Sequence, residues 1–166
     1  VHEAGEGMTV TFTDGVSVEV LNPPSPPLVG TASDLDNNGL VLRVRIKDAA
    51  VLFTGDLYIT SKPRFLRADE NMDDQIESLR RVVDLDFETV FCAHRGIVTE
   101  GQRAIRAKLD YLISLRDEIR HLHSEGRSVA EITKTLLGRE KLMSLITLYH
   151  FSKRNLVRAC LPAHAT

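Results

Sequence analysis

Two short apolar segments, each ending near a side chain that can bind a metal ion, constrain this chain more than any other feature. Residues 51–56 read Val-Leu-Phe-Thr-Gly-Asp, and residues 90–96 read Val-Phe-Cys-Ala-His-Arg-Gly. Apolar runs of this length with a glycine close by are typical of buried strands. Ligands of α/β proteins gather where strands end, so the two segments predict an α/β fold in which Asp56 and His94 could share one metal.

The order of the other segments also indicates an α/β fold. Alternating apolar and polar residues on both sides of the turn Asp14-Gly15 predict a β-hairpin. Residues 69–83 have helical spacing, and a further strand follows them. The expected strands cover residues 8–13, 16–21, 40–46, 51–56 and 87–92.

From residue 99 onward the pattern is helical almost throughout. Gly126 is typical of a helix stop, and Ser128 with Glu131 predicts a capping box at the start of the next helix. A last amphipathic helix is expected over residues 143–160. The first of these helices has apolar residues at three- and four-residue steps, namely Ile105, Leu109, Leu112, Leu115 and Ile119. We expect a single domain over residues 1–166, with a β-rich part at 8–98 and a helical extension at 99–160.

Composition and charge exclude several classes of protein. With 166 residues, 43% of them hydrophobic and 27% charged, the chain is typical of a soluble globular protein. Its formal net charge of -2 argues against general affinity for nucleic acid or for an anionic membrane. No apolar run approaches the ~20 residues that span a bilayer, and the first residues lack the features of a signal peptide. Cys92 and Cys160 form no disulfide framework, so we expect a cytoplasmic location.

Asp56 and His94 have side chains whose chemistry suits a metal site. A carboxylate at a strand end can bridge two cations through its two oxygens, and a neutral imidazole is a common zinc ligand. Each residue also has an ordinary structural explanation. Aspartate often caps a turn, and a histidine near a helix start is often satisfied by a backbone group. Both explanations stay open for each residue at this point.

The order of the two motifs resembles a known family. Phe-Thr-Gly-Asp at 53–56, followed later by Ala-His-Arg-Gly at 93–96, resembles the C-terminal half of the metallo-β-lactamase fold hydrolases. The resemblance implies half of an αβ/βα sandwich, in which Asp56 bridges two metals and His94 binds the second. It implies one or two zinc ions as cofactor. The implied activity is hydrolysis of an ester, thioester, amide or phosphodiester in a small-molecule substrate by a metal-activated water.

The chain also departs from that family. The chief ligand motif of the family, His-x-His-x-Asp-His, does not occur in it. The nearest segment, His121-Leu-His123, is expected at a helix end, where side chains two residues apart point to different sides. A further family histidine is missing where the proline-rich loop 22–27 and the polar turn 34–39 stand. We therefore expect the second half of a longer hydrolase, which binds zinc weakly and is inactive by itself.

A missing half would leave a sheet edge and an apolar face uncovered. Such a chain is expected to form a homo-oligomer, most simply a homodimer, to exchange strands, or to bury the surface with its own helices. The alternative function is a non-catalytic α/β interaction module that self-associates through its helices.

Four other features have both a functional and an ordinary explanation. Arg95 could meet an anionic substrate group, although an exposed arginine at a strand end is usually only solvated. Tyr58 could offer a hydroxyl to a substrate, although packing is its more common role. Cys92 is expected to be a small buried hydrophobe rather than a nucleophile. Residues 126–138 can be read as part of a helix-turn-helix, but the net charge and the lack of a basic recognition helix argue against DNA binding.

Overall fold

The computed structural model describes residues 5–22, 41–139, 146 and 150–162. It divides the chain into two compact units, the first formed by residues 1–61 and 79–107 and the second by residues 62–78 and 108–166. Helix α2 (Met72–Val83) and helix α3 (Gly101–Ser124) each begin in one unit and end in the other. A mixed sheet together with helices confirms the predicted α/β class. The single domain and the half-sandwich architecture stay predictions.

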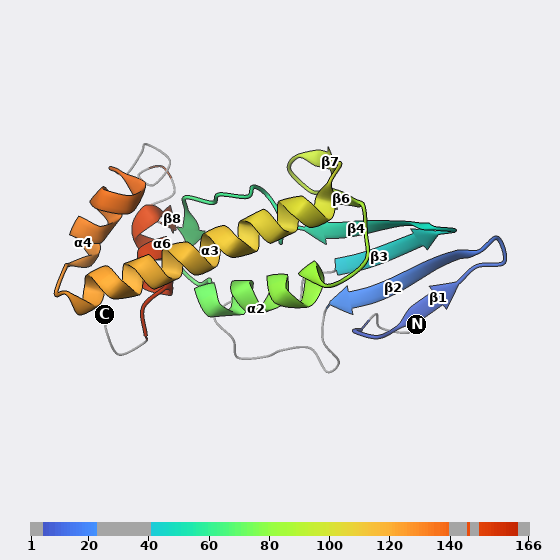
Figure 1. Cartoon of the computed structure of the whole chain (residues 1–166), viewed down its shortest axis with the longest axis horizontal. Helices are drawn as coiled ribbons and strands as arrows, with labels where there is room; N and C mark the ends of the chain where they lie inside the picture. Colours follow the sequence, from blue (N-terminus) through green and yellow to red (C-terminus); the bar gives the residue numbers. More distant parts are fainter. Residues whose placement is uncertain (1–4, 23–40, 140–145, 147–149, 163–166) are drawn as a thin grey trace. The chain divides into compact units, whose positions relative to one another are not determined.

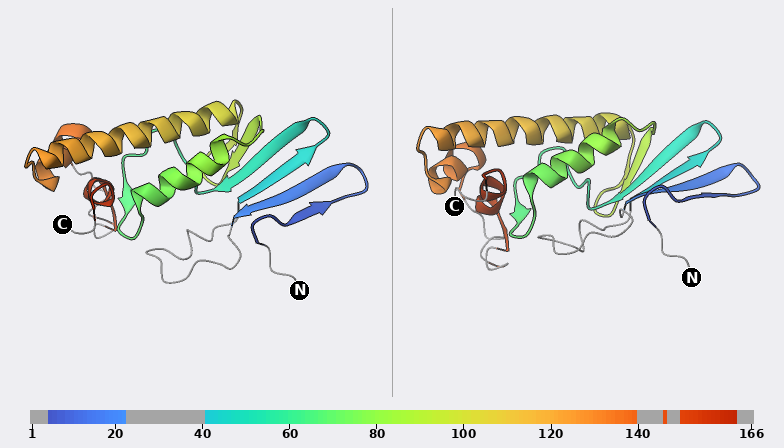
Figure 2. Two further views of the ribbon diagram at one scale, coloured as in Figure 1. Left: turned by 60° about the horizontal axis from the view of Figure 1, so that its bottom comes forward. Right: turned by 90° about the horizontal axis from the view of Figure 1, so that it is seen from below.

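The first unit contains a six-stranded mixed sheet with the strand order β1-β2-β3-β4-β6-β7 (Figure 1). Strands β4 and β6 are parallel, and the other neighbouring pairs are antiparallel. Hairpin β1–β2 and the short strand β7 therefore lie at opposite edges of the sheet (Figure 2). The six strands are β1 (Thr9–Thr11), β2 (Val16–Asn22), β3 (Val41–Ile46), β4 (Ala49–Gly55), β6 (Thr89–Cys92) and β7 (Gly96–Val98).

Glycine turns explain two reversals of the chain in this sheet. Gly15 has a φ of 82°, and the Asp14 carboxylate accepts the Val16 N–H at 3.3 Å, so the predicted hairpin is confirmed. Gly96 has a φ of 67° and allows β7 to turn back along β6 directly after His94. Strand β7 was not expected from the sequence, because three residues are too few to show a period of two.

One face of the sheet in the first unit carries the end of α2 and the start of α3. The Gly101 N–H donates to the Glu88 carbonyl at 2.6 Å, and the Gln102 side-chain amide donates to the carbonyls of Val83 and Leu85. A Cβ atom on Gly101 would lie 2.8 Å from the backbone nitrogen of Val90, so the helix start needs glycine for this close approach. Core side chains of this unit that are at most 6% exposed include Leu52, Leu79, Val82, Val83, Val90 and Ile105.

The second unit is mostly helical and includes a two-stranded antiparallel sheet of β5 (Leu66–Arg67) and β8 (Phe151–Ser152). Its other elements are α4 (Val129–Ile132), a π-helical segment η1 (Thr133–Leu137) and α6 (Lys153–Ala159). The predicted capping box is confirmed, because the Ser128 N–H donates to Glu131 and the Glu131 N–H donates to the Ser128 hydroxyl.

The predicted helix over residues 143–160 is wrong in its extent. Residues 151–152 pair with β5 as a strand, and α6 begins only at Lys153, where the Ser152 hydroxyl accepts the Asn155 N–H at 3.0 Å. Helical spacing could not reveal this strand, because it has only two residues. Residues 143–145 and 147–149 of that predicted helix lie outside the described residues, as do residues 23–27 of the predicted loop and the predicted turn at 34–39.

Candidate functional site

The two strands that carry the sequence motifs are neighbours and run parallel, so their carboxyl ends lie at the same edge of the sheet. Gly55 at the end of β4 is in register with Cys92 at the end of β6. The Ala93 N–H donates to the Gly55 carbonyl at 3.3 Å, which joins the two turns just beyond the strands. The chain therefore leaves both strands side by side, at the position where α/β proteins bind ligands.

The side chains of Asp56 and His94 are in direct contact. The His94 Nε2 atom lies 3.0 Å from the Asp56 Oδ1 atom. The His94 side chain is 58% exposed and the Asp56 side chain is 67% exposed, so solvent reaches both groups. The expectation that these two strand ends converge is met by this distance. A solvated carboxylate and a solvated imidazole at one point can both reach a bound ion.

The turns that hold this pair are short and internally hydrogen-bonded. Gly55 has a φ of 50°, a conformation that favours glycine, and the Leu57 N–H donates to the Thr54 carbonyl at 2.9 Å across the turn. The Thr54 hydroxyl also lies 3.5 Å from the Phe91 carbonyl of β6. Both ligand candidates are thereby held within a residue or two of a strand rather than on a long loop.

The pair supplies only part of the donor set that zinc requires. Catalytic zinc sites use three protein ligands and a water molecule. Among the residues that the structure describes, no three histidine, cysteine, aspartate or glutamate side chains are grouped so that they could hold one metal ion. Asp56 and His94 fit a zinc site in chemistry and spacing, but a complete site needs at least one further ligand from outside the described residues.

The other candidates from the sequence occupy ordinary environments. Cys92 is buried, as predicted, and its sulfur accepts the Arg95 N–H at 3.1 Å. Arg95 itself is exposed. His121 and His123 lie in the last turn of α3, where His121 Nε2 is 3.5 Å from a Glu125 oxygen, so the predicted solvated helix end is confirmed for this histidine. Residues 126–138 include α4 and η1, which are four and five residues long.

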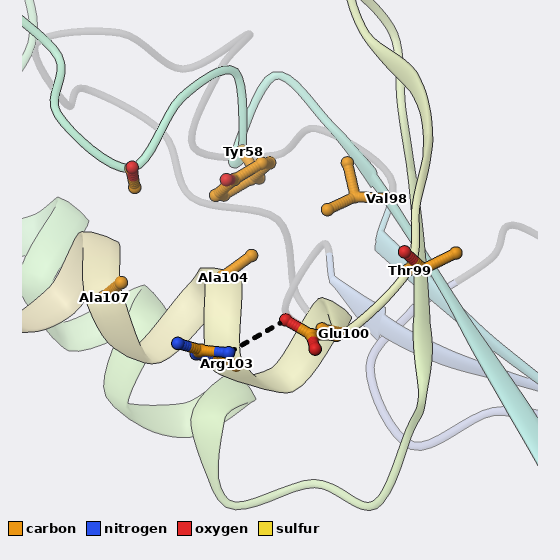
Figure 3. Close-up of a pocket in the computed structure, with 8 residues that line it drawn as sticks. Tyr58, Val98, Thr99, Glu100, Arg103, Ala104 and Ala107 are labelled. Carbon is orange, nitrogen blue, oxygen red and sulfur yellow. Dashed lines mark hydrogen bonds and ion pairs between the residues drawn. The ribbon is translucent and has the colours of Figure 1, made fainter.

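A pocket of about 320 Å³ in the first unit brings together residues that the sequence did not single out, apart from Tyr58 (Figure 3). The Tyr58 ring lies across the pocket from Ala104 and Ala107 of α3 (Figure 3). Tyr58 is only 5% exposed and follows Asp56 by two positions, so its ring packs as predicted while lining a cavity. Glu100 and Arg103 form an exposed ion pair of 3.1 Å at this pocket. The pocket is lined by Tyr58, Ser61, Val98, Thr99, Glu100, Arg103, Ala104 and Ala107.

No sequence signal marks this pocket, because its residues come from two stretches of chain that are far apart in the sequence, 58–61 and 98–107. One local feature does stand out in the structure. Glu100 adopts a φ of 50°, which is uncommon for a residue with a side chain, where β7 passes into α3. A pocket near 300 Å³ is at the small end of the range for small-molecule sites.

The two largest pKa shifts belong to Lys108 and Cys160, residues of the second unit. Lys108 on α3 is only 5% exposed, and burial lowers its pKa to about 8 although the Glu70 carboxylate acts in the opposite direction. Burial also raises the pKa of the Cys160 thiol to about 12. The guanidinium groups of Arg116 and Arg120 donate to Asp73 and lower the pKa of that carboxyl, against the opposing effect of burial.

Comparisons with known proteins leave the family open, since no family model matches this chain and no curated protein sequence matches it at a significant level. None of the described helices is both long enough and apolar enough to cross a membrane.

Proposed function

We propose that this chain is the C-terminal portion of a metal-dependent hydrolase of the metallo-β-lactamase type. In this proposal, Asp56 and His94 contribute one carboxylate and one imidazole to a zinc site. The observation that carries it is the 3.0 Å contact between these side chains at the ends of two parallel, adjacent strands. A further ligand would come from a polypeptide segment outside the described residues.

The chain's own residues would orient the imidazole and position the substrate. The contact between Asp56 Oδ1 and His94 Nε2 holds these two donor atoms at one point, where both would bind the ion. The pocket beside Tyr58 could hold the part of a small substrate that does not react. Zinc, when bound, supplies an activated water for attack on an ester, thioester, amide or phosphodiester.

A zinc titration of the full chain tests the proposal without any substrate. The imidazole resonances of His94 and His121 are followed by NMR as zinc is added. His121 is a matched control, because it too is exposed and lies 3.5 Å from a carboxylate, that of Glu125 in a helix. We expect His94 to respond at a zinc concentration at least about 10-fold lower than His121.

Substitution of the Asp56 carboxylate tests the contribution of the second proposed zinc ligand. In Asp56→Asn the His94 response should move to at least about 10-fold higher zinc, because an amide is a much poorer zinc ligand than a carboxylate. A Glu125→Asn variant should leave the His94 titration where it is. If His94 and His121 respond together in the unsubstituted chain, the zinc proposal is wrong.

A second candidate function is the non-catalytic α/β interaction module that the sequence also allows. Two observations favour it: Asp56 and His94 already satisfy each other, and no further metal ligand joins them among the described residues. Zinc content at equilibrium, in dialysis against a buffer that contains zinc, separates the two functions. About one or two equivalents favour the hydrolase, and less than about a tenth of an equivalent favours the module.

A further inference from the structure

The register of the six-stranded sheet sorts its side chains onto two different faces. Residues that pair directly across neighbouring strands point to the same side, so the pairs Val18–Val44 and Val44–Val51 share one face. The parallel pair Phe53–Phe91 and the antiparallel pair Phe91–Ile97 extend that face to the other edge. We call it the apolar sheet face, and its members are Val10, Val16, Val18, Val20, Leu42, Val44, Ile46, Ala49, Val51, Phe53, Phe91, Ile97 and one polar residue, Thr89.

The opposite face carries both the helices and all the charge of the sheet. Leu52 and Val90 pair in register there, and Gly101 at the start of α3 lies against Val90. The six strands contain three charged residues, Glu19, Arg43 and Arg45, and the register places all of them on this opposite face. Arg43 donates to Glu19, and Arg45 pairs with Asp86.

Several members of the apolar sheet face are exposed to an extent that is unusual for such residues, although Val20 on the same face is only 5% exposed. Val10 is 41% exposed, Ile46 is 50% exposed, Phe53 is 41% exposed and Ile97 is 63% exposed. These four residues come from four different strands, so the exposure extends across the sheet rather than at one edge. Exposed apolar side chains gathered on one face of a sheet are typical of an interaction site.

We propose that the apolar sheet face packs against the same face of a second copy of this chain. The face bears no charged residue, so two copies can meet without burying an unpaired charge. Strands about 4.8 Å apart that rise about 3.3 Å per residue give six strands of this length a flat footprint of about 500 Å². Two such flat footprints bury about 1,000 Å², which meets the lower bound for a biological interface, and the relief of the side chains adds to this area.

Two features of the face suit sheet-on-sheet packing. β-Branched valine and isoleucine fill most of it, and such side chains interdigitate when two sheets lie about 10 Å apart. The rings of Phe53 and Phe91 stack with centroids 5.0 Å apart and form its largest rigid element. Buried aromatic side chains of this kind contribute much of the energy of an interface. The proposal differs from self-association through helices, and it does not depend on any metal role of Asp56 or His94.

Sedimentation of the full chain in the presence of a chelator tests the proposal. We expect a dimer of twice the 18.5 kDa chain mass at micromolar concentration. Phe53→Glu and Ile97→Glu should each weaken dimerisation by at least about 100-fold, since each places two unpaired carboxylates in one interface. Ile97 is 63% exposed, so its substitution is the one less able to disturb the fold.

Ile59→Glu is the matched control. Ile59 is 40% exposed, close to the 41% of Phe53, but it follows β4 and does not belong to the apolar sheet face. It should leave the dimer constant unchanged, and circular dichroism should show all three variants to be folded. A chain that stays monomeric at about 100 μM, or a dimer that Ile97→Glu weakens no more than Ile59→Glu does, would overturn the proposal.

Discussion

Polar side chains at the strand ends of the first unit and those inside the second unit have opposite surroundings. Asp56 and His94 touch each other but are more than half exposed. Lys153 is 3% exposed, and its ammonium group donates to the carbonyls of Leu137 at 2.6 Å and Arg139 at 2.7 Å. Buried polar groups must be satisfied by the protein, whereas exposed ones on a stiff strand remain available to a ligand.

The buried polar groups of the second unit therefore have a structural role. Lys153 satisfies carbonyl groups where η1 ends, and Asn155 on the same helix donates to the carbonyl of His150 at 3.0 Å. Arg120 donates to the Cys160 carbonyl at 2.7 Å and to Asp73. Stability and ligand binding are thus expected to respond to different residues, and the predictions below test that separation.

The largest expected effect is on stability, from Lys153→Met. Removal of the ammonium group leaves the Arg139 carbonyl without this donor and the Leu137 carbonyl with only the Arg64 guanidinium at 3.0 Å, so the free energy of unfolding should fall by about 2 kcal/mol. Urea unfolding measures it. Arg158→Met is the control, since Arg158 is exposed on the same helix and its loss should change stability by less than about 0.5 kcal/mol. Equal effects of the two substitutions would contradict the distinction between buried and exposed groups.

Lys108 is expected to make the free energy of unfolding depend on pH, and this effect is intermediate in size. Its pKa is about 8 in the folded chain against 10.5 for an ordinary lysine, so the unfolded chain binds more protons between these values. Stability from this group therefore rises with pH, by about 1 kcal/mol between pH 8 and pH 9. We limit the comparison to pH 9, because the Cys160 thiol acts in the opposite direction at higher pH. The pKa of this thiol is about 12 in the folded chain and 9.0 ordinarily, so its ionisation favours the unfolded chain.

The measurement compares urea unfolding of the natural chain and of Lys108→Met at pH 8 and pH 9. The variant should lack this rise in stability, because methionine does not titrate. If both chains gain the same stability over this interval, the lysine does not titrate there.

The smallest expected effect on stability comes from the candidate site itself. Asp56→Ala and His94→Ala should each change the free energy of unfolding by less than about 0.5 kcal/mol, because an exposed ion pair contributes little. The same substitutions should remove the early zinc response of the site. Thermal unfolding and the zinc titration together check this, and a large loss of stability would make the pair structural instead.

Sequence patterns predicted those parts of the fold that depend on long or strongly marked segments. The hairpin at Asp14-Gly15, the strands that end near Asp56 and His94, and the capping box at Ser128 all have local signals that agree with the structure. Strands β7 and β8 have three and two residues, too few for a period, and only pairing with distant chain reveals them.

Two features of the sites differ in whether the sequence could have shown them. Lys108 stands three residues after Ile105 and four before Leu112, on the apolar stripe of α3, so its burial was open to prediction. The pocket at Tyr58 was not, because it forms only when the start of α3 meets the turn after β4.

The close approach of α3 to β6 links the helix to the histidine. Any side chain at position 101 would press on the Val90 backbone, four residues before His94. Strand β6 has only four residues and pairs with a strand on each side, so a shift of its backbone would also change the position of His94. Position 101 is therefore a place from which the spacing of Asp56 and His94 can be changed without replacing either residue.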